Sequence, residues 1–396
     1  MSNSSELPAI VVVTYNRTES LKRLLDSIDR ADYTGYENVP LVISVDKSDR
    51  SEVLDLAKSF VWKHGSKEVI EHNVNLGLRK HILACGDLSD QYGAVIVLED
   101  DLLVSPAFYD YAVQAMNFYA DADEVGGIGL YSYNYNDWVR LPFIPLDDGY
   151  DNYFFQCATS WGQLWTRKQW QGFKQWYETN SHLLIEKEEY LPASVKKWAQ
   201  SSWKKYFIAY LVRENKFFVY PRTSLSTNFS TAGTHVKNEA MTYQVPLLAK
   251  NKQFRFSHLN KSCSVYDVFY ELLPQCLKSL NSKLKELDFE CDFYGSKALE
   301  SVKSRYLIFI KECKSPIKSY SIRQLPQELN VVFDAEGNSF TLGEVSSFGG
   351  VNQKAQRVQF ISLWKGIGMS RCWNLYFHFL FDRVRHKLKS IQARLA

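Results

Sequence analysis

Apolar and polar positions along the first hundred residues follow a pattern that predicts strands alternating with helices. Four short apolar runs, rich in β-branched residues, have the length and composition of buried strands: residues 8–13, 39–45, 68–70 and 92–97. Residues 18–28 and 51–64 lie between them and repeat apolar side chains at the helical period. This alternation predicts an α/β fold with a mostly parallel, doubly wound (Rossmann-like) sheet flanked by helices.

Polar side chains follow these predicted strands at the points where the strands end. Glu99, Asp100 and Asp101 come directly after the fourth strand, Thr14 after the first and Asp46 after the second. The carboxyl ends of parallel strands meet at one sheet edge, where open α/β sheets bind their ligands. Adjacent carboxylates repel one another unless a cation neutralises them. The sequence therefore predicts a divalent metal ion that holds a phosphorylated ligand at this edge.

The remaining chain predicts further elements and a different C-terminal third. Ser105 and Pro106 have the residue types of an N-cap and a first helical position, which predicts a helix directly after the acidic triplet. A strand and a polar aromatic loop are expected over residues 124–138, with Tyr133, Asn134 and Asn136 as candidate wall residues of an acceptor site. The other predictions are helical spacing within 264–314, a strand at 306–310 and a hairpin formed by 329–333 and 340–342.

Composition restricts the class of protein. The chain has 396 residues, 45% hydrophobic and 23% charged, and a formal charge of +3, which is typical of a folded globular protein and gives no reason to expect nucleic acid as a partner. No run approaches the roughly 18 apolar residues of a membrane span, and the first residues lack the pattern of a signal peptide. Seven cysteines without a CxxC pair favour reduced thiols and predict a cytoplasmic protein.

Three segments resemble a known family. Residues 97–108 resemble the Glu-Asp-Asp-Leu segment of N-acetylglucosaminyltransferase I, with the proline and phenylalanine in register. The first strand with its Thr-Tyr-Asn-Arg end, residues 8–17, resembles the opening of family 2 glycosyltransferases, and residues 73–77 resemble their Asn-x-Gly donor loop. Since the segments occur in the family's order and spacing, residues 5 to about 245 resemble a glycosyltransferase of the GT-A fold.

The resemblance implies a metal-dependent, inverting hexosyl- or N-acetylhexosaminyltransferase. Such an enzyme moves a sugar from a nucleotide-sugar donor, with a UDP-sugar as the first expectation, to a hydroxyl of a saccharide or lipid-linked saccharide acceptor in surface polysaccharide or glycan biosynthesis. It implies Mn²⁺ or Mg²⁺ on Asp101, with His235 as a second candidate ligand. The candidate donor-binding residues are Thr14, Tyr15, Arg17, Asp46, Asn75, Gly77, Arg79, Glu99, Asp100, Trp161 and Gly162.

The sequence departs from the family at the expected catalytic base. The resemblance places an aspartate at the start of a helix near residues 202–204, where this chain has Ser-Trp-Lys. The candidate bases are therefore other acids: Asp147, Asp148, Asp151 and Glu188. Glu188 belongs to a charged run, 186–189, that is more typical of a solvated helix face.

The predicted domains are residues 1–245 for the GT-A domain, 246–362 for an accessory α+β module and 363–396 for a basic amphipathic helix. From residue 365 onward, seven lysines and arginines face a single acid, Asp382, and aromatic residues lie between them. Two interpretations fit this composition: a peripheral contact with the anionic inner face of a membrane, or a helix packed on the protein with a basic outer face.

Two alternative functions stay open. The absent acid near Lys204 favours a non-catalytic subunit that binds nucleotide sugar or carbohydrate in a polysaccharide assembly complex, whereas the intact acidic triplet argues against it. A nucleotide-sugar pyrophosphorylase is the weaker alternative, because such enzymes open with a glycine-rich phosphate loop and residues 14–19 contain no glycine.

Overall fold

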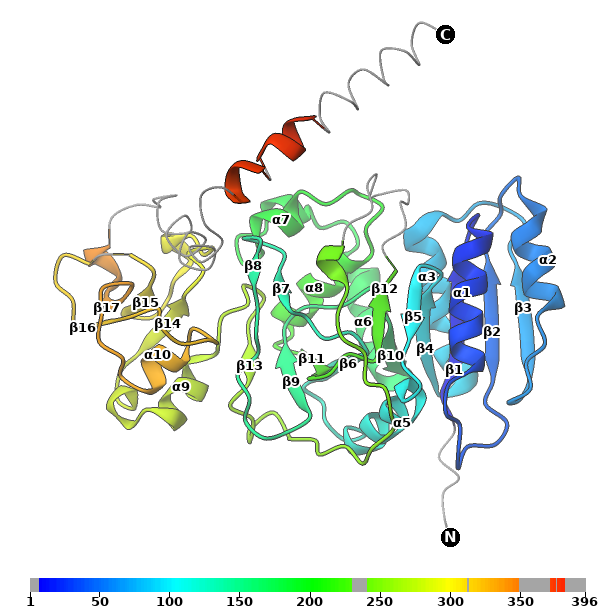
Figure 1. Ribbon diagram of the computed structural model, residues 1–396, viewed down its shortest axis with the longest axis horizontal. Helices are drawn as coiled ribbons and strands as arrows, with labels where there is room; N and C mark the ends of the chain where they lie inside the picture. Colours follow the sequence, from blue (N-terminus) through cyan, green and yellow to red (C-terminus); the bar gives the residue numbers. More distant parts are fainter. Residues whose placement is uncertain (1–6, 230–240, 312, 349–370, 375, 382–396) are drawn as a thin grey trace, which may run out of the picture. The chain divides into compact units, whose positions relative to one another are not determined.

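The computed structural model describes residues 7–229, 241–311, 313–348, 371–374 and 376–381. The chain divides into two compact units, residues 1–349 and residues 350–396. A nine-stranded sheet dominates the first unit (Figure 1). Its strands are β1 (Ala9–Thr14), β2 (Leu41–Val45), β3 (Lys67–Glu71), β4 (Ala94–Glu99), β6 (Val125–Gly129), β9 (Asn152–Phe155), β10 (Gln163–Thr166), β11 (Phe217–Pro221) and β13 (Val265–Tyr266).

The sheet is mostly parallel, as predicted. Its strand order is β13-β9-β11-β6-β10-β4-β1-β2-β3. Neighbours run parallel except that β10 is antiparallel to both β4 and β6, and β9 is antiparallel to β11. The last strand, β13, comes from residues 265–266, so the segment that completes the sheet extends beyond residue 245.

The register of the central strands aligns the polar strand ends that the sequence singles out. All six residues of β1 are buried, because this strand lies between β2 and β4 with helices over both faces. Val13 pairs with Glu99, and Thr14 pairs with Val45, the residue before Asp46. Thr14, Asp46 and Glu99 therefore lie along one edge of three adjacent strands.

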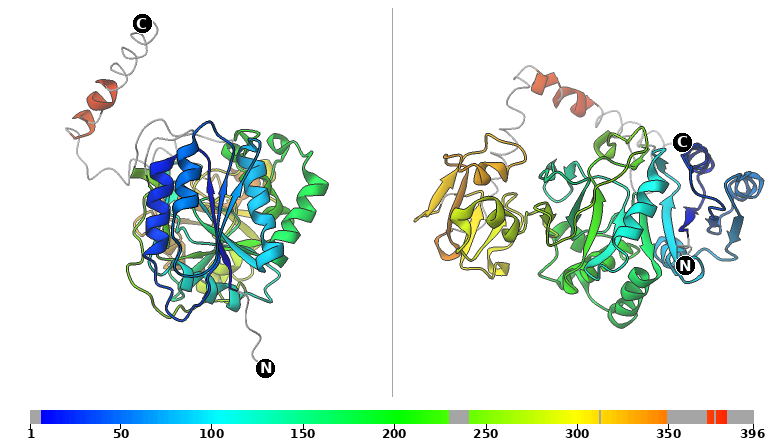
Figure 2. Two further views of the ribbon diagram at one scale, coloured as in Figure 1. Left: turned by 90° about the vertical axis from the view of Figure 1, so that its right-hand side faces the viewer. Right: turned by 90° about the horizontal axis from the view of Figure 1, so that it is seen from below.

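Helices cover both faces of the sheet. In Figure 2 (left), α1 and α2 lie on one face of the N-terminal strands and α3 on the other. Helix α1 buries Leu21, Leu24, Leu25 and Ile28, which recur at the helical period that predicted it. The helices of this part are α1 (Thr18–Asp29), α2 (Ser51–Ser59), α3 (Gly77–Asp87), α4 (Ser89–Tyr92), α5 (Phe108–Phe118), α6 (Arg167–Asn180), α7 (Ala193–Lys196) and α8 (Lys204–Arg213).

The predicted helix start at Ser105 and Pro106 is wrong. Residues after the acidic triplet form a short strand, β5 (Leu102–Val104), which pairs antiparallel with β12 (Ser226–Asn228), and α5 begins only at Phe108. The Ser105 hydroxyl still accepts a hydrogen bond from the backbone N–H of Ala107 at 3.1 Å. The strand ends at Val104, and Ser105 starts a turn that leads into α5 three residues later.

A second, four-stranded sheet forms the smaller C-terminal module. Its order is β14-β15-β17-β16, with β14 (Phe289–Asp292), β15 (Tyr306–Phe309), β16 (Lys318–Tyr320) and β17 (Phe340–Glu344). The predicted strand at 329–333 is wrong, because Leu329–Val332 forms the short helix α10. The Asn330 side chain bonds the backbone of Arg323, Gln324 and Gln327, which fixes a compact turn where the β-branched residues favour a strand.

The helical spacing within 264–314 corresponds to only one α-helix, α9 (Pro274–Leu280). Val265 and Tyr266 instead pair with Phe154 and Phe155 as the edge strand β13. In the second unit, residues 371–374 and 376–381 are helical, with six aromatic and apolar side chains 43–70% exposed: Trp373, Tyr376, Phe377, Phe379, Leu380 and Phe381. Within the described ranges we find no helix with the length and apolar content needed to cross a membrane.

A buried charge cluster joins the end of the large sheet to the small one. Glu271 accepts hydrogen bonds from the backbone N–H groups of Phe293 and Tyr294, at 2.8 and 2.9 Å. Lys297, with a side chain 8% exposed, lies 2.7 Å from a carboxylate oxygen of Asp267. Burial raises the pKa of Glu271 well above its usual value, and the Lys297 cation opposes this shift.

We therefore predict that Lys297→Met destabilises the protein by about 3–5 kcal/mol, the range for removing one partner of a buried ion pair. Thermal melting measures the change. Lys283→Met is the matched control, because the Lys283 side chain is 72% exposed in its ion pair with Asp334 and its loss should hardly move the melting temperature. Equal shifts for the two variants would show that the buried cluster does not hold the module.

Candidate active site

Three consecutive acids form the centre of the site at the carboxyl end of β4. The second of them, Asp100, is 2% exposed and has defined partners. Its carboxylate accepts a hydrogen bond from the Thr14 hydroxyl at 2.8 Å and forms an ion pair with the Arg17 guanidinium. Asp100 thus holds the end of β1 and the start of α1 against β4, and both Thr14 and Arg17 belong to the predicted donor-binding set.

Glu99 is half-buried, and one of its carboxylate oxygens is enclosed without a direct partner. Its Oε1 atom has no hydrogen-bond partner among the described residues. Burial, with the charges of Asp101 and Asp100, raises the pKa of Glu99 to about 8, while Arg17 and Lys204 oppose the shift. A buried carboxylate of this kind is costly unless another cation or donor approaches it.

Asp101 is more accessible than Asp100. Its side chain is 23% exposed, and the nearest described cation, Arg17, is 3.6 Å from it. Oxygen ligands from carboxylates are those that Mg²⁺ and Mn²⁺ prefer. The exposed Asp101 and the unpartnered Glu99 oxygen fit a divalent cation, although within the described ranges no group of three or more His, Cys, Asp or Glu side chains is arranged as a complete metal site.

Asp46 organises the neighbouring loop. Its carboxylate accepts hydrogen bonds from the backbone N–H groups of Leu76 and Gly77, at 2.8 and 3.1 Å. The Asn75 side chain donates to the Lys47 carbonyl at 3.0 Å. Asp46, Asn75 and Gly77 therefore lie together, as the donor-binding prediction requires, and their printed contacts hold the loop that leads into α3.

Two further predicted donor-binding residues present unused groups. The Tyr15 side chain is 41% exposed directly after β1. The Arg79 guanidinium lies over the Tyr206 ring, 4.7 Å from its centroid, and its buried Nε and Nη2 atoms have no hydrogen-bond partner among the described residues. A half-buried cation with two enclosed, unpartnered donor atoms is suited to an anionic group such as a diphosphate.

Trp161 and Gly162 lie against the acidic edge. The Leu130 N–H, at the end of β6, bonds the Gly162 carbonyl at 2.9 Å, and the Ser226 hydroxyl of β12 bonds the Trp161 carbonyl. The Phe229 N–H, just after β12, bonds the Asp101 carbonyl at 2.8 Å. Strand β12 thus connects the acidic triplet with the Trp161–Gly162 segment.

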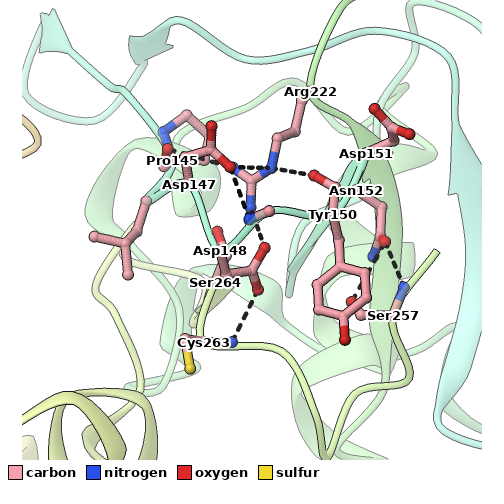
Figure 3. A network of polar contacts seen from close by, with 12 residues as sticks. Pro145, Asp147, Asp148, Tyr150, Asp151, Asn152, Arg222, Ser257, Cys263 and Ser264 are labelled. Atoms are coloured by element: carbon pink, nitrogen blue, oxygen red, sulfur yellow. Dashed lines mark hydrogen bonds and ion pairs between the residues drawn. The ribbon is translucent and has the colours of Figure 1, made fainter. Parts of the chain in front are cut away.

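The structure places three of the predicted bases in a separate network (Figure 3). Asp148 is paired with Arg222 at 2.7 Å and accepts from the Ser262 hydroxyl at 2.7 Å. Asp151 is paired with Lys252, and the Asp147 side chain is 80% exposed. This network joins β9 and β11, three to four strand positions from β4, which corresponds to roughly 14–19 Å.

The remaining predicted residues divide in the same way. Glu188 forms an ion pair with Arg213 at 2.7 Å. Its described partner is therefore a surface side chain and not a residue of the acidic edge. His235 lies outside the described residues. The structure therefore brings the donor-binding candidates together and leaves the proposed bases apart from them.

Residues 9–175 match the family described as Glycosyl transferase family 2. We refer to this matched segment, which covers less than half of the chain, as the family 2 domain. The match contains β1, the acidic triplet and Trp161, so the resemblance stated from the sequence is confirmed for this part. No curated protein matches the sequence.

Solved structures are similar to parts of the chain at low identity. One is GalNAc-T7 with UDP, GalNAc and Mn²⁺, at 15% identity and a TM-score of 0.36, covering 56% of this chain and 43% of that one. Another is the mannosyltransferase PcManGT from Pyrobaculum calidifontis with GDP-Man and Mn²⁺, at 14% identity and a TM-score of 0.29, covering 43% and 47%. The similar part spans less than half the length of either structure.

Sequence reasoning missed one acid near the family 2 domain's site. Asp137, in the loop after β6, has a buried Oδ1 atom with no hydrogen-bond partner among the described residues. Lys204, at the start of α8, lies over the Trp198 ring, which packs on Trp138, the residue after Asp137, and its charge lowers the pKa of both Asp137 and Glu99. The available signal was an acid flanked by aromatic residues, Tyr135 and Trp138, after a strand that ends at the same edge.

Gly162 offers a direct test of how closely this segment approaches the edge. Its φ is +92°, and a Cβ would lie 3.1 Å from Ser226 Oγ and 3.2 Å from Leu98 Cδ2. We predict that Gly162→Ala lowers stability by about 1–3 kcal/mol more than Gly35→Ala. Gly35 has a similar φ, +86°, and open space around it, so it isolates the backbone cost. Thermal melting of both variants measures the difference; equal losses would contradict the close approach.

Proposed function

We propose that the protein is a metal-dependent glycosyltransferase that moves a sugar from a nucleotide-sugar donor to a hydroxyl of a saccharide acceptor. The observation that carries the proposal is the acidic edge of the family 2 domain, where Glu99 and Asp101 lack a full complement of cations. Arg79, with its free buried donors, supplies the opposite charge that a diphosphate needs. Carboxylates and an unpaired guanidinium in one site suit an anionic ligand bound through a divalent cation.

The residues have separate roles in this proposal. Asp101 would hold Mn²⁺ or Mg²⁺ together with the donor diphosphate, and His235 is a further candidate ligand from the sequence. A bound divalent cation would stabilise the negative charge on the departing diphosphate. Asp100 keeps Thr14 and Arg17 in place, and the neighbouring Glu99 offers a buried Oε1 atom without a partner among the described residues.

The donor pocket would extend along the neighbouring strand ends. Tyr15 and the loop fixed by Asp46 would receive the nucleoside, since Tyr15 follows β1, the neighbour of β4, and Asp46 follows β2, the next strand along. Trp161 and Gly162 would form the wall for the donor sugar, because glycine lets backbone approach a ligand closely and a half-buried ring packs on an apolar sugar face. A UDP-sugar and inversion at the transferred carbon are the expectations from the family resemblance, with surface polysaccharide or glycan biosynthesis as the setting.

One observation favours a second function, a non-catalytic subunit that binds nucleotide sugar or carbohydrate. The family resemblance expects an aspartate at the start of α8, and Lys204 stands there. Both functions include donor binding, so turnover separates them. Release of nucleoside diphosphate from a UDP-sugar supports the enzyme, and binding without release supports the subunit.

We predict that Asp101→Ala weakens Mn²⁺-dependent UDP binding by at least the roughly 10–100-fold that follows loss of a residue supporting a metal ligand. The fold should persist, since the one described ion pair of this side chain is the 3.6 Å contact with Arg17. Calorimetric titration with UDP, with and without Mn²⁺, measures the effect, and thermal melting checks the fold.

Asp123→Ala is the control for this experiment. The Asp123 side chain is 80% exposed and lies just before β6, at the opposite edge of the sheet from the acidic triplet. It should bind UDP as the wild type does. If Asp101→Ala keeps the wild-type Mn²⁺ dependence, the metal assignment is wrong.

We propose further that the C-terminal helix attaches the enzyme to an anionic membrane surface, which would place its work at the cytoplasmic face beside a lipid-linked acceptor. The described helical residues expose Trp373, Phe377 and Phe381, at 54%, 48% and 70%. The sequence from residue 365 onward adds seven basic residues against one acid. Exposed aromatic residues together with basic charge suit an anionic lipid interface.

Deletion of residues 365–396 should reduce co-sedimentation with vesicles containing anionic phosphatidylglycerol, and rising salt should reduce binding of the full chain, because a basic patch is screened within ~10 Å at 0.1 M salt. A variant with Phe377→Ser and Phe381→Ser keeps the charge and tests the aromatic contribution. Vesicles of neutral phosphatidylcholine are the lipid control. Equal sedimentation of the full and shortened chains would instead support a helix packed on protein.

A further inference from the structure

Asp137 lies in an enclosed position beside the family 2 domain's site. It belongs to the turn between β7 (Tyr135–Asn136) and β8 (Leu141–Pro142), and its Oδ1 atom is buried without a partner among the described residues. The ring of Tyr135, two residues before Asp137, lies 6.3 Å from the ring of Tyr243, centroid to centroid. The free Oδ1 atom of Asp137 therefore lies in a turn that packs on Tyr243.

The groups around Asp137 converge on Trp161, which the proposed function places at the donor sugar. The Tyr243 ring lies 4.9 Å from the Trp161 ring, centroid to centroid. Lys204 Nζ lies 5.5 Å from the Trp161 centroid and 5.0 Å from that of Trp198. The indole of Trp161 is thus the shared neighbour of the two side chains that act on Asp137.

Lys204 also connects Asp137 with the acidic edge. Its positive charge acts on Glu99 at the end of β4 as well as on Asp137. The geometry agrees, because the Trp198 ring beside Lys204 also lies 5.9 Å from the ring of Trp138, the residue after Asp137.

We propose that Asp137 is the general base of the transfer reaction, and that Lys204 is a positioning residue that keeps its carboxylate ionised. The proposal rests on the proposed function. In the step, the acceptor O–H proton passes to Asp137 Oδ1 while the acceptor oxygen bonds to the donor's anomeric carbon. The bond from that carbon to the diphosphate oxygen breaks, and its electron pair leaves with the diphosphate. The proton is later lost from Asp137 to water.

The surroundings suit a base and exclude the neighbouring groups from this role. Burial raises the pKa of Asp137, while Lys204, Tyr243 and Arg140 lower it, which leaves a carboxylate that binds a proton more strongly than an exposed one. Burial raises the pKa of Tyr243 to about 12, so it is a hydrogen-bond donor at neutral pH. Lys204, as an ammonium, has no acceptor.

Asp137→Asn tests the proposal in the full-length protein. The assay follows release of nucleoside diphosphate with water as the acceptor, in the presence of Mn²⁺. The donors are UDP-glucose, UDP-galactose, UDP-N-acetylglucosamine, UDP-N-acetylgalactosamine and GDP-mannose. For the donor that the wild type consumes, kcat is then determined from pH 5 to 9. We expect kcat to fall roughly 10²–10⁴-fold. Asp137→Glu should recover part of it, and Asp123→Asn should behave as the wild type.

Two readouts do not depend on turnover. The affinity for UDP with Mn²⁺ should change less than threefold in Asp137→Asn, because a base contacts the acceptor and not the diphosphate. A carboxyl group whose pKa is higher in the folded than in the unfolded protein lowers the folding stability as the pH rises. The loss begins near the unfolded-state pKa and is complete above the folded-state pKa. The melting temperature of Asp137→Asn, relative to the wild type, should therefore rise from pH 4 to pH 8.

Lys204→Met distinguishes positioning from a structural role. Removal of the cation raises the pKa of Asp137, so the rise of kcat with pH should move to higher pH while Asp137 still acts. An Asp137→Asn enzyme within threefold of the wild-type kcat, or one that loses UDP binding together with turnover, overturns the assignment. A wild type that neither binds UDP with Mn²⁺ nor consumes any donor overturns the proposed function itself.

Discussion

The concentration of three carboxylates at the end of one buried strand is the constraint on which the rest of the site depends. The Asp100 carboxylate is balanced by the Thr14 hydroxyl and the Arg17 guanidinium. The pKa of Glu99 is raised, an effect that Arg17 and Lys204 oppose, and the Asp101 side chain is partly exposed to solvent. The described cations leave the triplet incompletely neutralised. In the proposed function, a divalent cation bound with a diphosphate would neutralise the remaining negative charge of the triplet.

The sheet places the other groups around this triplet. Parallel register brings Thr14 and Asp46 to the same edge as Glu99. The antiparallel strand β10 starts at that edge, and Trp161 and Gly162 come directly before it in the chain. Helix α8 then begins with Lys204 over the Trp161 ring. The base proposed above would complete the site from a loop rather than from this helix.

The strand-end half of the site was predictable because it follows from local pattern. A few neighbouring residues are enough to predict the buried strands, the helices between them and the acids that follow β4. The parallel order of the strands then brings their carboxyl ends together. Asp137 was not predictable in this way, because its role depends on Tyr243 and Lys204, more than sixty residues away. The same limit explains β5, which forms by pairing with β12, more than a hundred residues away. Helix α10 has a different cause, because the local bonds of Asn330 outweigh the strand preference of Val331 and Val332. Asp148 was wrongly placed near the site because the sequence of an acid-rich loop does not show that Arg222, 74 residues away, neutralises the carboxylate.

The most direct test of the central claim is a crystal structure of the full chain with UDP and Mn²⁺, with anomalous scattering recorded to locate manganese. We expect an anomalous peak within coordination distance of the Asp101 carboxylate, with the diphosphate between this position and Arg79. Manganese or UDP bound elsewhere, with the acidic edge unchanged, would contradict it.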